Sequence, residues 1–371
     1  MVKEQITEWI RDGKVKPGDK IYSEKELSGM FAVSRHTVRQ AIGALVHEGL
    51  LYREQGAGTF CSASPNLSAN DSYAGPSGSS PASVNRKNIG VITTYISDYI
   101  FPSIIKGIES YLTAEGYSLT LACTDNDLEK EKQCLQAMLN RGVDGLIVEP
   151  TRSSNYNPNI NYYLALEQNQ IPYLMINQFY AQLMPPHVIV NDDHGGFIAT
   201  DHLIRLGHHR IVGLFKTDDL QGIERMKGFI RAFRENEVEF FSEMVLTYTT
   251  EEQGSALIRR LEPFFSGASP LPTAIVCYND QLALAVLDLL RKQGLRVPDE
   301  ISIVGFDDSP LAEASEVKLT SVTHPKMELG MAAAKWIVAA VEGMDLLPQS
   351  IVYEPRLVIR GSTASVKGRE V

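Results

Sequence analysis

The sequence predicts an α/β protein with a small N-terminal domain of three helices and a hairpin, and a large domain of two doubly wound parallel-sheet subdomains. The chain is long enough for two or three folded domains, with 371 residues and 44% hydrophobic content. Its middle contains a segment rich in small and polar residues, and short apolar strands alternate with helical stretches after that segment. These three observations together define the fold class.

Composition divides the chain into residues 1–61, 62–88 and 89–371. In the middle segment, 17 of 27 residues are Ser, Gly, Pro or Ala, and large apolar residues are scarce. Such a segment cannot nucleate a hydrophobic core, so we expect a flexible tether between two separately folded domains.

Charge and cysteine usage narrow the class of protein. The net charge is −10, yet the first 61 residues carry nine Lys or Arg against eight Asp or Glu, so the acidity belongs to the large domain. The four cysteines show no metal-ligand spacing, and we expect no metal or other cofactor. The opening stretch is charged where an export signal would be apolar, so we expect a cytoplasmic protein without a membrane segment.

The first domain is predicted to contain helices at 2–12, 24–31 and 34–48, followed by a β-hairpin in LLYREQGAGTFC at 50–61. This order defines a winged helix-turn-helix, in which the third helix enters the major groove of DNA. Ser34 stands at the N-cap of that helix. Arg35 and Arg39 then lie on its first turns, where an arginine can contact guanine or phosphate.

The run PGDKIYSEKELSGMFAVSRHTVRQAIGALVHEGLLYREQGAGTF resembles the DNA-binding domain of the GntR family. The resemblance implies a homodimer that binds operator double-stranded DNA. It places these residues at the DNA-facing positions: Glu24, Ser34, Arg35, His36, Thr37, Arg39, Gln55 and Gly56.

The large domain is predicted to alternate strands and helices in the manner of parallel sheets. Strands are expected at 89–94, 117–124, 144–149, 171–177, 210–215, 273–278 and 301–306, and helices at 103–115, 127–140, 193–206, 222–236 and 279–293. About 280 residues exceed one typical sheet, so two subdomains facing one another across a cleft are the natural packing. In such sheets a ligand binds outside the carboxyl ends of the strands.

Three runs resemble the LacI/GalR effector domain, which is similar to periplasmic sugar-binding proteins: RLGHHRIVGLF at 205–215, CYNDQLALAVLDLLRKQGLRVPDEISIVGFDD at 277–308 and GFDDSPLAEASEVKLTSVTHPKMELGMAAAKWIV at 305–338. The resemblance extends over about residues 89–362 and implies a periplasmic-binding-protein-like domain that binds a small sugar. Sugar hydroxyls both donate and accept hydrogen bonds, so their site needs carboxylates, amides, an arginine and an aromatic face.

Polar residues at predicted strand ends supply such a site, and the resemblance adds an arginine in GIERMKGF and an aromatic in SDYIFPSIIKGIE. The predicted effector-binding residues are Tyr95, Tyr99, Phe101, Glu149, Asn177, Arg225, Asn279 and Asp307. Each also has a purely structural alternative: Asp307 could cap a turn, Phe101 could lie in the core and Asn279 could cap the next helix.

The combined architecture, with TTYISDYIFPSIIKGIESYL and DGLIVEPT, resembles sugar-utilisation repressors of Gram-positive bacteria, and this resemblance implies L-arabinose as the inducer. From composition and spacing alone, only a small polyol follows. The alternatives are a regulator of another pentose or of a phosphorylated sugar, and a sugar-binding protein without repressor action. An enzyme is not expected, because no Walker loop, GxSxG elbow or HExxH motif is present.

Overall fold

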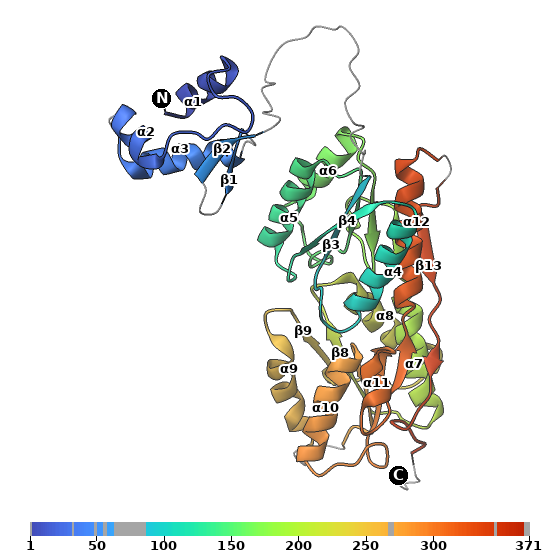
Figure 1. Ribbon diagram of the computed structural model, residues 1–371. Helices are drawn as coiled ribbons and strands as arrows, with labels where there is room; N and C mark the ends of the chain where they lie inside the picture. The colour runs from blue at the N-terminus through green and yellow to red at the C-terminus, as the bar shows by residue number, and fades with distance from the viewer. Residues whose placement is uncertain are drawn as a thin grey trace. The chain divides into compact units, whose positions relative to one another are not determined.

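The computed structural model describes residues 2–31, 33–47, 50–54, 58–62, 87–265, 271–344 and 347–366. The chain forms two compact units, residues 1–83 and residues 84–371 (Figure 1). Most of the predicted tether, residues 63–86, lies outside the described residues.

The N-terminal unit has the predicted three helices and hairpin. Its elements are α1 (Val2–Arg11), α2 (Glu24–Phe31), α3 (Arg35–His47), β1 (Leu51–Glu54) and β2 (Gly58–Cys61). The two strands pair antiparallel, with Leu51 opposite Cys61. Val38, Ile42 and Leu45 recur on one face of α3 and are fully buried, as their spacing predicts.

The C-terminal unit contains two six-stranded sheets, each forming the centre of one lobe. The first lobe contains β3 (Asn88–Thr93), α4 (Phe101–Ala114), β4 (Ser118–Cys123), α5 (Leu128–Arg141), β5 (Gly145–Val148), α6 (Ile160–Gln168), β6 (Tyr173–Ile176), β7 (His187–Val190), α12 (Lys326–Val341) and β13 (Ser350–Tyr353). Its strand order is β13-β7-β6-β5-β3-β4, and all the pairs are parallel.

The second lobe is built in the same way. It contains α7 (Asp192–Arg205), β8 (Ile211–Lys216), α8 (Leu220–Glu235), η1 (Ser242–Met244), β9 (Val245–Tyr248), α9 (Gln253–Leu261), η2 (Glu262–Phe265), β10 (Ala274–Cys277), α10 (Asp280–Lys292), β11 (Ser302–Asp307), α11 (Pro310–Ala314), β12 (Thr320–Thr323) and β14 (Leu357–Val358). Its strand order is β14-β12-β11-β10-β8-β9, and only β14 is antiparallel to its neighbour. All seven strands and five helices that the sequence predicts in the large domain are present, with ends shifted by a few residues.

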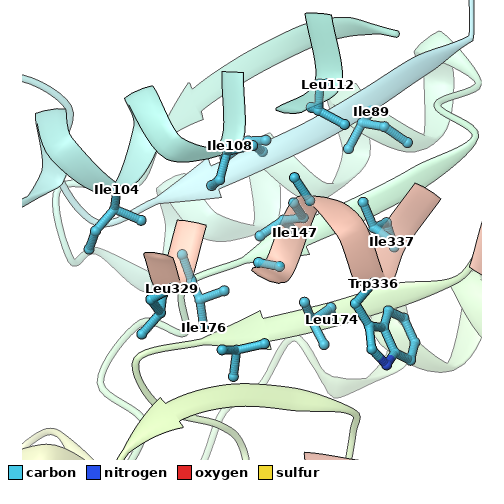
Figure 2. Close-up of a cluster of buried hydrophobic side chains, with 14 of the residues drawn as sticks. Ile89, Ile104, Ile108, Leu112, Ile147, Leu174, Ile176, Leu329, Trp336 and Ile337 are labelled. Atoms are coloured by element: carbon cyan, nitrogen blue, oxygen red, sulfur yellow. The ribbon is translucent and has the colours of Figure 1, made fainter. Parts of the chain in front are cut away.

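The chain crosses between the lobes three times, after β7, after β12 and after β13. The crossing after β12 carries α12 back to the first lobe, where it packs beside α4 against the sheet (Figure 2). Ile108 and Leu112 of α4 and Ile337 of α12 converge there on Ile147 and Leu174 of the strands. Three chain segments thus connect the lobes, which is the arrangement of a hinge about which two bodies can close.

Helices α7 and α8 make an unusually close contact in the second lobe. A Cβ added to Gly196 would lie 2.1 Å from the Arg225 carbonyl oxygen, and one added to Gly228 would lie 1.9 Å from the Asp193 carbonyl oxygen. Glycine at both positions therefore lets the two backbones touch, and this contact brings the start of α7 beside Arg225. Among the described residues, no helix is long and apolar enough to cross a membrane.

Candidate functional site

A cavity of about 410 Å³ lies between the two lobes, at the carboxyl ends of both parallel sheets. This is where an open α/β sheet binds its ligand, and the volume suits a small molecule. Seven of the eight predicted effector-binding residues line this cavity: Tyr95, Tyr99, Phe101, Glu149, Arg225, Asn279 and Asp307.

Arg225 projects from α8 into a buried setting and is only 2% exposed. Its Nε donates to Asp192 Oδ1 at 2.7 Å, Nη1 donates to the Tyr278 carbonyl at 2.7 Å, and Nη2 lies 3.4 Å from Asp307 Oδ1. The guanidinium also stacks 3.6 Å from the centre of the Phe306 ring. A guanidinium has five N–H groups, so these contacts leave two of them for a ligand.

The charges around Arg225 are strongly coupled. Burial raises the pKa of Asp192 to about 7, against the opposing effect of the Arg225 charge. Burial alone would lower the pKa of Arg225, but the carboxylates of Asp192 and Asp307 raise it, so the guanidinium is charged. Arg225 is thus held in one orientation by groups from three different elements, ready to form a fork of hydrogen bonds.

Glu149 follows β5 and provides a buried carboxylate on the first-lobe wall. It accepts hydrogen bonds from the Thr94 backbone N–H at 3.0 Å, from Thr94 Oγ1 at 2.6 Å and from Asn177 Nδ2 at 2.8 Å. Burial raises the pKa of Glu149, while these three donors favour its ionised form. Asn177 does not line the cavity. It lies behind Glu149, with its Oδ1 3.2 Å from His324 Nε2.

Aromatic side chains cover one side of the cavity. The rings of Tyr95 and Phe101 meet edge to face at 5.5 Å. Tyr99 extends from the first lobe to the second, where its hydroxyl donates to the Phe306 carbonyl at 3.0 Å and accepts from the Asp280 backbone N–H at 3.1 Å. Burial raises the pKa of Tyr99 well above its ordinary value, so this hydroxyl keeps its proton. These rings offer the apolar face that the C–H surface of a sugar requires.

Asn279 and Asp307 combine a structural role with their place on the wall. Asn279 caps α10, because its Oδ1 accepts from the Leu282 backbone N–H at 2.9 Å, as the structural alternative foresaw. Asp307 has a positive φ of 88°, and Lys326 Nζ donates to its carbonyl oxygen at 2.5 Å. This uncommon backbone conformation turns the Asp307 carboxylate toward Arg225.

The polar wall at the end of β8 was not predicted from the sequence. Lys216 Nζ lies 2.9 Å from Asp219 Oδ2 and 3.4 Å from Asp218 Oδ1, and Tyr278 donates its hydroxyl to Asp219 at 2.8 Å. The sequence contains a pattern that could have predicted it, because the polar run KTDD at 216–219 directly follows the predicted strand at 210–215. The further lining residues are Thr94, Asp98, Ile100, Asn126, Gln178, Lys216, Asp219, Gln221, Tyr248, Thr249, Thr250, Tyr278 and Gln281.

The charge balance of the wall indicates the kind of ligand. Four carboxylates face two cations: the lining contains Asp98, Glu149, Asp219 and Asp307 with Lys216 and Arg225. Each of the two cations is already paired with a carboxylate. Such a wall favours a neutral molecule with many hydroxyl groups over an anion. Within the described part of the chain, no cluster of three or more His, Cys, Asp or Glu could hold a metal ion.

The N-terminal unit carries the predicted DNA-facing helix, α3. Ser34 caps it, with Oγ accepting from the Thr37 backbone N–H at 3.1 Å, and Ser34, Thr37 and Arg39 are exposed. The side chains of Glu24, Arg35 and His36, and all of Gln55 and Gly56, lie outside the described residues. Their DNA contacts therefore stay predictions.

Comparison with known proteins agrees with this architecture. Residues 1–61 match the family described as bacterial regulatory proteins, gntR family, and residues 200–363 match a periplasmic binding protein-like domain. The fold and the cavity thus define a transcriptional regulator with a DNA-binding head and a ligand-binding effector domain. A LacI family transcriptional regulator from Enterococcus faecium, solved with bound ribose, is 25% identical with a TM-score of 0.65, over 76% of this chain and 100% of that chain.

Two relatives match over nearly their whole length. The arabinose metabolism transcriptional repressor of Halalkalibacterium halodurans is 51% identical, over 100% of this chain and 97% of that protein. That of Geobacillus stearothermophilus is 47% identical, over 98% of this chain and 97% of that protein. The chain belongs to the family of arabinose metabolism transcriptional repressors, and it is a regulator, not an enzyme.

Proposed function

We propose that the chain represses sugar-utilisation genes in the cytoplasm by binding operator DNA as a homodimer, and that a small neutral sugar, L-arabinose, releases it. The names of the two full-length relatives support arabinose as the regulated sugar. The solved regulator with bound ribose supports a pentose as the ligand.

The observation that carries the proposal is the environment of Arg225. A buried guanidinium with two N–H groups to spare stands beside the carboxylate of Asp307, and Glu149 faces them from the other lobe. Neighbouring hydroxyl groups of a sugar can accept from the arginine and donate to the carboxylates at the same time. A sugar bound in this way contacts both lobes and therefore favours the closed cleft.

The alternatives are a phosphorylated sugar, another pentose, and sugar binding without repressor action. Lys216 adds a second cation to the wall, but Asp218 and Asp219 neutralise it, so a phosphate would meet net negative charge. The gntR family head opposes a binding protein without DNA affinity. Another aldopentose differs from arabinose only in hydroxyl stereochemistry, and a direct comparison of sugars decides between them.

In the proposed mechanism, both heads of a dimer engage two half-sites, spaced by about 34–36 Å or a multiple of it. Closure of the cleft changes how the two effector domains meet, which lowers the effective concentration of the second head at its half-site. The proposal therefore needs no direct contact between the sugar and the DNA-binding domain.

Titration of the full-length protein with a panel of sugars tests the proposal. Calorimetry should give one site per chain for L-arabinose and weaker binding for D-ribose, D-xylose and L-arabinose 5-phosphate. Fluorescence anisotropy with labelled operator should show release by the same sugar. Equal binding of all four, or tight operator binding at saturating L-arabinose, would contradict the proposal.

A further inference from the structure

Side-chain contacts join the two lobes at the loops that follow β4 and β5 of the first sheet and β8 and β9 of the second. Asn126 Nδ2 of the first lobe donates to Thr250 Oγ1 of the second at 2.6 Å, and Ser154 Oγ donates to the Thr217 carbonyl at 2.6 Å. Arg152 and Glu251 form an ion pair across the same gap. Arg152, Ser154 and Glu251 do not line the cavity.

We propose that these contacts form a latch, made of Asn126, Arg152 and Ser154 with Thr217, Thr250 and Glu251, that sets effector affinity by stabilising the closed cleft. The proposal rests on the proposed function, because it takes a sugar as the ligand that closes the cleft. It assigns to Arg152 and Glu251 an influence on sugar affinity without contact with the sugar.

The Asn126–Thr250 contact of the latch lies far from the chain crossings between the lobes. The chain crosses between the lobes at β7 and β13 of the first sheet and at β12 and β14 of the second, all at one edge. Asn126 follows β4 and Thr250 follows β9, which are the opposite edges of the two sheets. Five strand spacings separate the edge strands of each six-stranded sheet, or about 24 Å, so a lobe rotation of about 10° about the crossing edge would separate Asn126 from Thr250 by about 4 Å. An opening of the lobes about the crossing edge therefore breaks the Asn126–Thr250 bond.

The first-lobe half of the latch is held in place by the backbone. Asn126 and Arg152 both have positive φ values, 56° and 48°, which are uncommon for residues with a side chain. Two bonds tie them together: the Arg152 backbone N–H donates to Asn126 Oδ1 and Arg152 Nε donates to the Asn126 carbonyl, each at 3.1 Å. Such a strained, mutually supported arrangement is typical of functional positions. Here it presents an amide and a guanidinium to the facing loop.

The latch connects directly to the sugar site. Asn126 and Thr250 line the cavity, so one bond of the latch lies on its wall, while the Arg152–Glu251 pair lies outside it. The affinity of a ligand that requires the closed cleft is its intrinsic affinity multiplied by the closed fraction. Weakening the outer pair should therefore raise the apparent Kd and leave the sugar contacts intact.

The test uses the full-length protein and L-arabinose, measured by isothermal titration. Glu251→Gln removes one charge, and its Kd should rise about two- to fivefold, the range for an exposed ion pair. Glu251→Arg should raise it further through repulsion, and Arg152→Glu combined with Glu251→Arg should bind more tightly than Glu251→Arg alone. Glu243→Gln is the matched control, because Glu243 is exposed at the opposite end of β9 and should bind as the unmodified protein does.

A second measurement does not need a ligand. Backbone hydrogen exchange in peptides covering residues 122–128 and 248–252 should be faster in Glu251→Arg than in the control, with or without sugar. Unchanged Kd and unchanged exchange in the Glu251 variants would overturn the latch, as would an equal effect in Glu243→Gln. Failure of the unmodified protein to bind L-arabinose would instead refute the proposed ligand, and the exchange measurement would still decide on the latch.

Discussion

Replacing Arg225 tests the sugar site most directly. Arg225 contributes to stability through its ion pairs with Asp192 and Asp307, and it contributes to sugar binding through its two remaining N–H groups. Arg225→Ala would leave the buried carboxylates of Asp192 and Asp307 without their counter-charge. The free energy of unfolding should fall by about 3–5 kcal/mol. A loss of sugar binding in Arg225→Ala could therefore come from unfolding and would not by itself show a lost sugar contact. Arg225→Lys keeps the positive charge but removes the paired N–H donors of the guanidinium, so it tests sugar binding without removing the counter-charge of the two carboxylates.

The expected loss of affinity follows from the hydrogen bonds. Arg225 has two N–H groups left for sugar hydroxyls, and each charge-assisted bond contributes about 1.5–3 kcal/mol. Lysine can replace one of these bonds but not both, so the Kd for L-arabinose should rise about 10- to 100-fold. Isothermal titration measures it. Operator affinity without sugar should stay unchanged, and repression should become harder to relieve.

Arg231→Lys is the control for this prediction. Arg231 lies six residues further along α8, is partly exposed, pairs with Asp193 and Glu235 and does not line the cavity. Its replacement should leave the Kd unchanged. Sugar affinity in Arg225→Lys equal to that of the control would remove Arg225 from the binding site and refute the reasoning.

Three further predictions concern other parts of the chain. Arg39→Ala should weaken operator binding by about 1–3 kcal/mol in an anisotropy assay if Arg39 reads a base, with calorimetric sugar binding unaffected; loss of both activities would indicate misfolding. Gly228→Ala should destabilise the effector domain by about 1–3 kcal/mol in thermal unfolding, because its Cβ would meet the Asp193 backbone; an unchanged Tm would contradict the close α7–α8 contact. Burial lowers the pKa of His324 to about 4, so the folded state stays neutral while the unfolded state takes up a proton below about pH 6.5. Stability should therefore fall by about 3 kcal/mol more between pH 6.5 and 4 than in His324→Gln, measured by denaturant titration at each pH; equal pH dependence would refute the neutral histidine.

The sequence was sufficient for the elements whose patterns are local. The alternation of apolar strands with amphipathic helices predicted two doubly wound sheets, and α3 follows from its cap at Ser34 and its apolar spacing. The helix α12 was missed, although it fills the core beside α4. It follows a strand of the second lobe and packs on the first, and a local pattern carries no information about such a crossing.

For the site, residues placed by their own strand could be predicted from the sequence, and contacts that depend on the packing of two helices could not. Polar residues at strand ends were visible in the sequence, and the cavity is lined by most of those selected. The partnership of Arg225 with Asp192 was not visible, because it depends on two glycines that let α7 and α8 touch. Asn177 also follows a strand, but its side chain turns to Glu149 and His324 instead of the cavity.

The central claim is that sugar binding between the lobes controls the affinity of the N-terminal domain for operator DNA. The most direct measurement is the anisotropy of labelled operator bound to the full-length protein during titration with L-arabinose, at fixed salt. The account predicts release along a curve whose midpoint follows the calorimetric Kd, and a shift of that midpoint to higher sugar in Arg225→Lys. Operator affinity that is the same at zero and at saturating sugar would contradict it.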